Sequence, residues 1–230
     1  MKIKKLVAAL SLSAFSLAAA AEDYRVEVGA SYVDFDFADG FGISGEVHFD
    51  EVSTSGLPLE EAAYLGHSNN AFLNYIDIDG DDITLIGVEL YLNGFYFAPM
   101  YADSSLGDGE FSAALGYASE NGWRVSTTVP EEDYEANVDF KYVTALSSGN
   151  YINFEASFED GGDFGENAFT IGGDYYFDET LSVGAVVIDQ FDTDFGIRAN
   201  KFFTPTFRAG AMFISGDAFD TISIDASVRF

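Results

Sequence analysis

The last ten residues, 221–230, read TISIDASVRF and decide the fold of the chain. Isoleucine, alanine, valine and phenylalanine stand at every second position, and polar or charged residues stand between them. Successive side chains of a β-strand point to opposite faces, so this alternation predicts a strand with one apolar and one polar face. A soluble sandwich and a membrane barrel both contain such strands, so other segments must decide between them.

The amino terminus has the pattern of a secretory signal peptide. Lys2, Lys4 and Lys5 precede an apolar run that ends near residue 17, and four alanines follow at 18–21. The apolar run is too short to span a bilayer comfortably. We predict that residues 1–21 are cleaved after Ala21 and that residues 22–230 form one barrel domain.

The predicted mature chain is strongly acidic. It keeps 7 basic residues against 39 acidic ones, a formal charge of −32, which disfavours nucleic-acid binding. A hydrophobic content of 48% argues against disorder. The chain has no cysteine to form disulfides or thiolate metal sites, so its stability must come from a sheet.

Alternating segments recur about every 12 to 15 residues, with turn residues between them. Residues 134–142 alternate most clearly, the first two strands are predicted to join at Asp39-Gly40, and the alternation blurs between residues 71 and 103. No segment after the signal peptide offers the 18 or so apolar residues of a membrane helix, but about ten alternating residues can cross in a closed barrel. Together with the signal peptide, the strand number favours an all-β, antiparallel up-and-down transmembrane barrel over a sandwich. We predict about 14 strands, within the range 12–16.

Three consecutive stretches resemble a known family. They read VEVGASYVDFD at 26–36, GISGEVHFD at 42–50 and EVSTSGLPLEEAAYLGHSNN at 51–70, and they are similar to the general porins of Gram-negative outer membranes. The carboxy-terminal Phe230 also resembles the signal read by the barrel-assembly machinery. The resemblance implies an outer-membrane barrel with a channel role and carries over no catalytic motif.

Aromatic residues near the predicted strand ends suggest interfacial girdles, although aromatics suit strands in general. The predicted girdle residues are Tyr24, Phe49, Trp123, Tyr134, Tyr142, Tyr151, Phe158, Phe169, Phe177, Phe207 and Phe230.

The turns fall into two sets. Short, mildly charged turns such as Asn93-Gly94 are predicted to face the periplasm, and acidic turns such as residues 79–82 to face outward. The acidic set would either concentrate cations at the pore mouth or bind divalent ions that bridge to lipopolysaccharide. An explanation of equal weight is that the acidic turns only keep the chain soluble during export.

The polar faces of the strands carry the candidate functional residues. Fourteen strands about 4.8 Å apart and tilted by about 40° give a backbone diameter of roughly 28 Å, which leaves a passage on the order of 14 Å between side chains. Mixed charges inside it either line water or cross-link into a plug, and their acidic excess predicts a modest cation preference. The predicted pore-lining residues are Arg25, Glu27, Glu46, His48, Asp50, Glu89, Arg124, Glu135, Asp139, Lys141, Glu155, Asp174, Arg198, Arg208, Asp225 and Arg229.

Residues 51–70 form the one irregular stretch, with a helix-compatible run at 59–65. The topology places this stretch on the periplasmic side. We predict that Leu57, Leu59 and Leu65 fold it over the pore exit.

Other chemistry finds little support. The aspartates of residues 77–82 look like a calcium loop, but an EF-hand needs glycine where Asp82 stands and glutamate where Val88 stands, so a hairpin is predicted. His48 is predicted to line the lumen rather than act as a base, and no catalytic motif accompanies it or His67. We therefore predict no enzyme activity, no cofactor and no metal site.

The sequence thus predicts a passive diffusion channel for small hydrophilic solutes or ions, held in outer-membrane lipid and lipopolysaccharide. The alternative is a closed structural or adhesive barrel whose inner charges plug the lumen.

Overall fold

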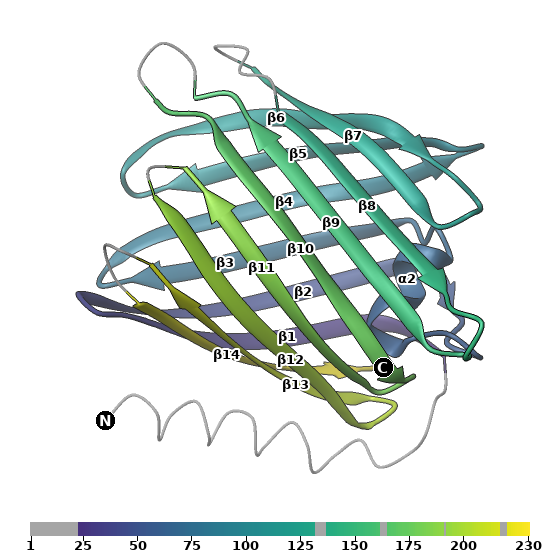
Figure 1. The fold of residues 1–230 in the computed structure, drawn as a ribbon. Helices are drawn as coiled ribbons and strands as arrows, with labels where there is room; N and C mark the ends of the chain where they lie inside the picture. Colours follow the sequence, from purple (N-terminus) through teal and green to yellow (C-terminus); the bar gives the residue numbers. More distant parts are fainter. Residues whose placement is uncertain (1–22, 132–136, 162–164, 191, 217–219) are drawn as a thin grey trace.

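The structure, a computed structural model, describes residues 23–131, 137–161, 165–190, 192–216 and 220–230. Within them fourteen strands form one closed antiparallel barrel, in which each strand pairs with its neighbours in sequence and β1 pairs with β14 (Figure 1). The predicted strand number and topology are confirmed. The strands are β1 Tyr24–Phe35, β2 Ala38–Val52, β3 Asn70–Ile78, β4 Asp81–Leu92, β5 Phe95–Ser104, β6 Gly107–Ala118, β7 Trp123–Pro130, β8 Asn137–Ala145, β9 Tyr151–Glu159, β10 Ala168–Asp178, β11 Leu181–Asp189, β12 Thr193–Thr204, β13 Phe207–Ser215 and β14 Asp220–Arg229.

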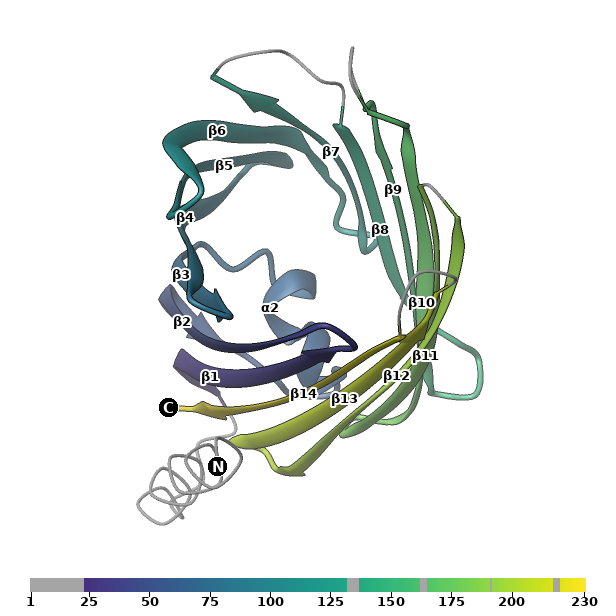
Figure 2. The same cartoon turned by 90° about the vertical axis from the view of Figure 1, so that its left-hand side faces the viewer.

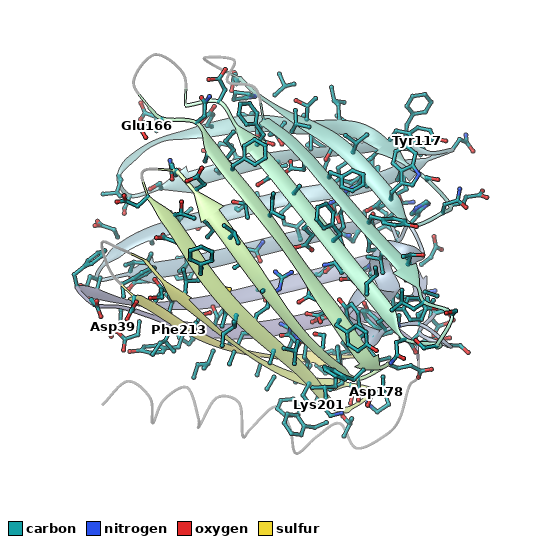
Figure 3. The ribbon with its side chains drawn as sticks, viewed as in Figure 1. Asp39, Tyr117, Glu166, Asp178, Lys201 and Phe213 are labelled. Atoms are coloured by element: carbon teal, nitrogen blue, oxygen red, sulfur yellow. The ribbon has the colours of Figure 1, made fainter. Side chains whose placement is uncertain are left out.

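The outer face of the barrel is apolar because the alternation of each strand places its large hydrophobic side chains there. In β14, Ile222 is 53% exposed and Ile224 41% exposed, whereas Asp225 faces the interior beside Arg208. Tyr117 projects from the outside of the wall (Figure 3). Among the described residues, no helix is long and apolar enough to cross a membrane.

The two ends of the barrel differ. The end that holds the start of β1 and the end of β14 is here called the terminus end, and it also carries the long connection between β2 and β3. The opposite end is called the distal end. Asp178 and Lys201 lie at the terminus end and Asp39 at the distal end (Figure 3). The aspartate-rich hairpin is also distal: Asp79 and Gly80, at φ 53° and 102°, form the two-residue turn between Ile78 and Asp81. The predicted hairpin is confirmed.

The first turn was predicted at the wrong place. Asp39 and Gly40 lie inside β2, and the chain reverses at residues 36 and 37. Gly40 suits the strand because a Cβ there would lie 2.8 Å from Val33 Cγ1 and 3.0 Å from Ile78 Cγ1. Cross-strand crowding, not turn geometry, therefore requires the glycine. The described part of β8 spans Asn137–Ala145, and residues 134–136 of its predicted range lie outside the described residues.

The alternation blurs between residues 71 and 103 because β3 and β4 are apolar on both faces. The register pairs Asn70 with Glu89 and Asn74 with Leu85, so Leu85 shares the inner face with Glu89. Ile86, one residue later, is 49% exposed on the outside.

The connection between β2 and β3, residues 53–69, is here called the inner segment. It contains the 3-10 helix η1 (Leu59–Glu61) and the short helix α2 (Ala62–Leu65), as the helix-compatible run predicted. It turns inward rather than away from the barrel, and α2 lies within the ring of strands (Figure 2).

Candidate functional site in the barrel lumen

Two neighbouring carboxylates fix the inner segment to the part of the wall that runs from β8 to β13. Glu61, 3% exposed, lies 2.8 Å from Lys141 Nζ and accepts a 2.7 Å hydrogen bond from the Tyr176 hydroxyl. Glu60 lies 3.1 Å from Arg208 Nη1 and accepts a 3.0 Å bond from the Ser182 hydroxyl. Adjacent residues of one helical turn thus reach neighbouring stretches of the wall, Glu61 at β8 and β10 and Glu60 at β11 and β13.

Backbone groups of the inner segment make further bonds around the ring. The Leu59 N–H donates to the Glu179 carbonyl at 2.8 Å, and the Leu59 carbonyl accepts from Arg229 Nη1 at 2.7 Å. The Tyr151 hydroxyl donates to the Gly56 carbonyl at 3.1 Å. The segment therefore constricts the terminus end of the lumen from several sides, and Leu59 is buried there, as predicted from its sequence position.

Burial also sets the ionisation of the inner segment. Desolvation raises the pKa of Glu60, against the opposing influence of the Arg208 guanidinium. Burial likewise raises the pKa of the Tyr64 hydroxyl, which lies 3.0 Å from the Lys141 carbonyl. It lowers the pKa of His67, whose ring stacks on that of Tyr91. Each shift favours the neutral form of the group.

The lumen wall next to the inner segment is a network of ion pairs. Arg198 lies 2.6 Å from Asp174 and 3.0 Å from Glu155, and Glu155 lies 3.3 Å from Lys141. Arg208 pairs with Asp225. Charges this close hold one another in place, so the wall is charged but largely neutralised.

Arg229 extends this network to the place where β1 pairs with β14. Its guanidinium is 4% exposed, lies 2.6 Å from Glu27 and packs against the rings of Tyr24 and Phe202 at 4.4 and 4.5 Å. With its bond to Leu59, Arg229 joins the first strand, the last strand and the inner segment.

The wall is asymmetric in charge. The cationic side chains of the lumen network lie on strands β7 to β14, while β1, β2 and β4 contribute the carboxylates of Glu27, Glu46 and Glu89. Glu89 lies 3.6 Å from Arg124, which also stacks on Tyr96 at 4.2 Å. Glu46 differs from these neighbours, because its one ion pair among the described residues is with His48, at 3.4 Å.

Most of the predicted lumen residues meet in this network. Arg25 does not: a β-bulge between Tyr24 and Val26 breaks the alternation there, and Arg25 is exposed. Asp50 is exposed near the end of β2, and Asp139 lines a cavity of about 490 Å³ with Arg198. Glu135 lies outside the described residues. The ion-paired or cavity-lining members are Glu27, Glu46, His48, Glu89, Arg124, Asp139, Lys141, Glu155, Asp174, Arg198, Arg208, Asp225 and Arg229.

Sequence reasoning missed the carboxylates of the inner segment. Glu60 and Glu61 belong to no alternating strand, and their only signal is two acidic residues directly after Pro58 and Leu59 in a helix-compatible run. Two predicted girdle residues were also wrong: Tyr24 is buried against Arg229, and Tyr151 bonds to the inner segment. Girdle residue Tyr134 lies outside the described residues.

Comparisons with known proteins agree on the kind of barrel. A profile of the family described as putative general bacterial porin matches residues 117–230. The crystal structure of the Acinetobacter baumannii outer membrane protein Omp33 is similar over 90% of this chain and 99% of its own, with a TM-score of 0.83 and 25% sequence identity. Among curated protein sequences, none matches significantly.

More distant structures share the fold alone. The KdgM porin has a TM-score of 0.52 and 7% identity over 89% of this chain and 99% of its own. A Rhodopseudomonas blastica porin variant has a TM-score of 0.50 and 12% identity over 90% of this chain and 99% of its own.

The family match lies in the second half of the chain, whereas the stretches that suggested the same family lie between residues 26 and 70. The predicted family is therefore confirmed, although by a different part of the sequence. The closed fourteen-strand barrel, its charged lumen and these matches agree, and the chain belongs to the family described as putative general bacterial porin, a family of outer-membrane porins.

Proposed function

We propose that the protein is a passive diffusion channel for small hydrophilic solutes with a modest cation preference. The observation that carries the proposal is the charged lumen itself. Cavities of about 360 and 490 Å³ lie inside the ring, lined by carboxylates such as Glu46 and Asp139 together with cations such as Arg198. Fixed charge in a low-dielectric wall concentrates counterions, and the carboxylates of the lumen outnumber its cations.

The inner segment sets the narrowest part of this channel. It lies at the terminus end, where the even strand number brings both termini together, and we assign this end to the periplasmic side. Its contacts are ion pairs and hydrogen bonds through Glu60 and Glu61 and one small apolar cluster, in which Ala62 packs against Tyr24 and Val52. Such a segment can shift without unfolding the barrel, so we expect the open channel to require its displacement or partial release.

The same contacts favour one alternative, a closed structural barrel. If the ion pairs of Glu61 with Lys141 and of Arg198 with Asp174 are permanent, they cross-link the lumen into a plug. The two proposals differ in whether purified protein conducts ions.

The decisive measurement is single-channel conductance of the refolded mature protein in a planar bilayer, with the reversal potential under a salt gradient. We expect steady, cation-selective steps in the wild type. Deletion of residues 55–66 should raise the conductance about threefold, because it removes the constriction. As a matched control, Glu179→Gln should leave it unchanged, since the inner segment contacts the backbone of that residue.

Each outcome separates the two proposals. A silent wild type with a conducting deletion variant would establish the plugged barrel. Silence of both folded proteins would contradict the channel outright, and equal conductance of both would show that the segment does not limit flow.

The proposal includes partners at both membrane surfaces. The acidic distal turns would attract cations or bind divalent ions that bridge to lipopolysaccharide. Phe230 would be the residue that the barrel-assembly machinery recognises. Exchanging the distal aspartates and glutamates for asparagine and glutamine should reduce cation selectivity. Unchanged selectivity would contradict the steering role.

A further inference from the structure

We propose that the lumen wall formed by β1 to β4 carries a binding subsite for small organic ammonium ions with an apolar body. The proposal rests on the channel function above and names the class of solute that the channel prefers. Two adjoining cavities, of about 360 and 430 Å³, make up the subsite, and they share Glu27, Ser44 and Asn74 in their walls.

The smaller cavity is the polar end of the subsite. Glu27, Glu46 and Glu89 line it from three strands. Glu27 is neutralised by Arg229, and Glu89 is held by the Tyr96 hydroxyl and by Arg124. Glu46 has neither an arginine nor a lysine within ion-pair distance in the described parts of the chain, so its carboxylate is open to a cationic ligand.

A second observation at this cavity points to a hydrogen-bond donor. Asn70 lines the same cavity and is 2% exposed. Its Nδ2 donates to Glu89 Oε2 at 3.0 Å, but its Oδ1 is buried without a hydrogen-bond partner. An unsatisfied buried acceptor costs free energy that a donor would recover. An ammonium group, which has three donors and no acceptor, fits a site made of carboxylates and an amide oxygen.

The aromatic side chain of Phe72 lines the polar cavity together with Glu46. Phe72 pairs directly with Glu46 across the β2–β3 ladder, and its ring covers Gly87, where a Cβ would lie 2.6 Å from Phe72 Cζ. A cation beside Glu46 would therefore also meet an aromatic ring, which favours ammonium groups over anions.

The larger cavity extends this site with an apolar wall on the β3–β4 side, while Arg208 and Asp225, which pair with each other, line its other side. Ile76, Ile83 and Leu85 line it, and their register places them on the inner face with Asn74. An inorganic ion gains nothing from apolar side chains, whereas an alkyl chain is removed from water there. The arrangement of carboxylates, amide oxygen, ring and apolar wall therefore matches an amine that carries a short hydrocarbon body.

The test uses n-butylammonium chloride as the probe, with ammonium chloride and n-butanol as the charge-only and chain-only controls. Binding to the detergent-solubilised full barrel is measured by titration calorimetry, and block of the potassium current is measured in planar bilayers. We expect n-butylammonium to bind at least about tenfold more tightly than either control.

Two variants separate the parts of the subsite. Glu46→Gln should weaken n-butylammonium binding about tenfold and Leu85→Asn about fivefold, and Leu85→Asn should leave ammonium binding unchanged. Ile214 is an apolar inner residue of β13 that lines neither cavity of the subsite, so Ile214→Asn is the matched control and should bind like the wild type. Faster migration of the unheated protein in a detergent gel checks that each variant is folded.

The results distinguish this subsite from the channel function. Equal binding of n-butylammonium and its two controls, or unchanged binding in folded Glu46→Gln, would overturn the subsite even if the barrel conducts potassium. Selective binding in a barrel that does not conduct would support the subsite and contradict the channel.

Discussion

The two halves of the lumen are built on different principles. At the terminus end, buried charges such as Glu61 and Arg229 hold the inner segment inside the ring. Toward the distal end, β3 and β4 present apolar side chains such as Ile83 and Leu85 to the interior. One half is fixed by directional bonds between charged groups, and the other is a wall without specific partners.

The difference shows where sequence changes are tolerated. A buried charge that loses its partner is destabilising, because the remaining charge stays desolvated. An apolar side chain that faces a water-filled lumen contributes little to folding, because it is only half-buried in either case. We therefore expect stability to depend on the terminus half and solute preference to depend on both halves.

The largest effect is expected at Arg229. Arg229→Met should destabilise the barrel by about 3–5 kcal/mol, because it leaves Glu27 without its buried cation and the Leu59 carbonyl without its donor. Denaturant unfolding of the barrel in detergent micelles, followed by Trp123 fluorescence, measures the change. Arg25→Met is the matched control, since Arg25 is an exposed arginine at the same end, and it should change stability by less than about 0.5 kcal/mol. Equal effects would mean that burial does not decide the role of the two arginines.

The next effect compares two adjacent residues of β4 on opposite faces. Ile86→Lys should cost about 2–4 kcal/mol, because it places a charge against lipid near the middle of the strand, whereas Leu85→Lys should cost less than about 1 kcal/mol in the lumen. The same unfolding experiment measures both. A larger cost for Leu85→Lys would show that the distal half is packed rather than water-filled.

A smaller effect is expected on ion selectivity. Glu46→Gln should lower the potassium-to-chloride permeability ratio about twofold, because Glu46 is a lumen carboxylate whose ion pairs among the described residues include no arginine or lysine. Glu110 lies on the inner face of β6 toward the distal end of the barrel. Glu110→Gln should therefore change the permeability ratio much less. Reversal potentials under a salt gradient provide the measurement. Equal responses would mean that selectivity is not set in the narrow half.

The smallest effect is a pH dependence carried by Glu60. Because burial raises the pKa of Glu60, docking of the inner segment is strongest when Glu60 is protonated. The stabilisation of the docked segment by protonated Glu60 is complete below the ordinary pKa of 4.5. It is lost as the pH rises through the raised pKa. Glu60→Gln imitates the protonated form at every pH. The variant should therefore conduct like the wild type in acid and less than the wild type at neutral pH.

Conductance measured between pH 4 and 8 tests this difference. Both proteins keep His67, whose lowered pKa acts in the opposite sense, so the comparison isolates Glu60. A constant conductance ratio across this range would show that Glu60 does not control docking.

The sequence predicts the barrel wall well because alternation is a local property. Strand β14 could be read from ten residues, and its pairing with β1 follows once the barrel closes. The lumen contacts depend on distances across the ring, which alternation does not contain. Glu60 and Arg208 are 148 residues apart in sequence, and no local pattern links them. The bulge beside Arg25 is likewise a feature of the pairing between β1 and β2, which the alternation within β1 alone does not contain.

The bonds of Arg229 also constrain the order of biogenesis. This residue is the penultimate one of the chain, yet it touches Glu27 at the start of the barrel and Leu59 in the inner segment. Until the final strand is in place, β1 and β13 are open edges able to pair with other chains, and the inner segment lacks one of its donors. A chain that stops before β14 would leave both edges exposed. Completion of the wall therefore also adds the last donor to the inner segment, and an assembly intermediate that lacks β14 would have two unpaired strand edges and a less firmly held inner segment.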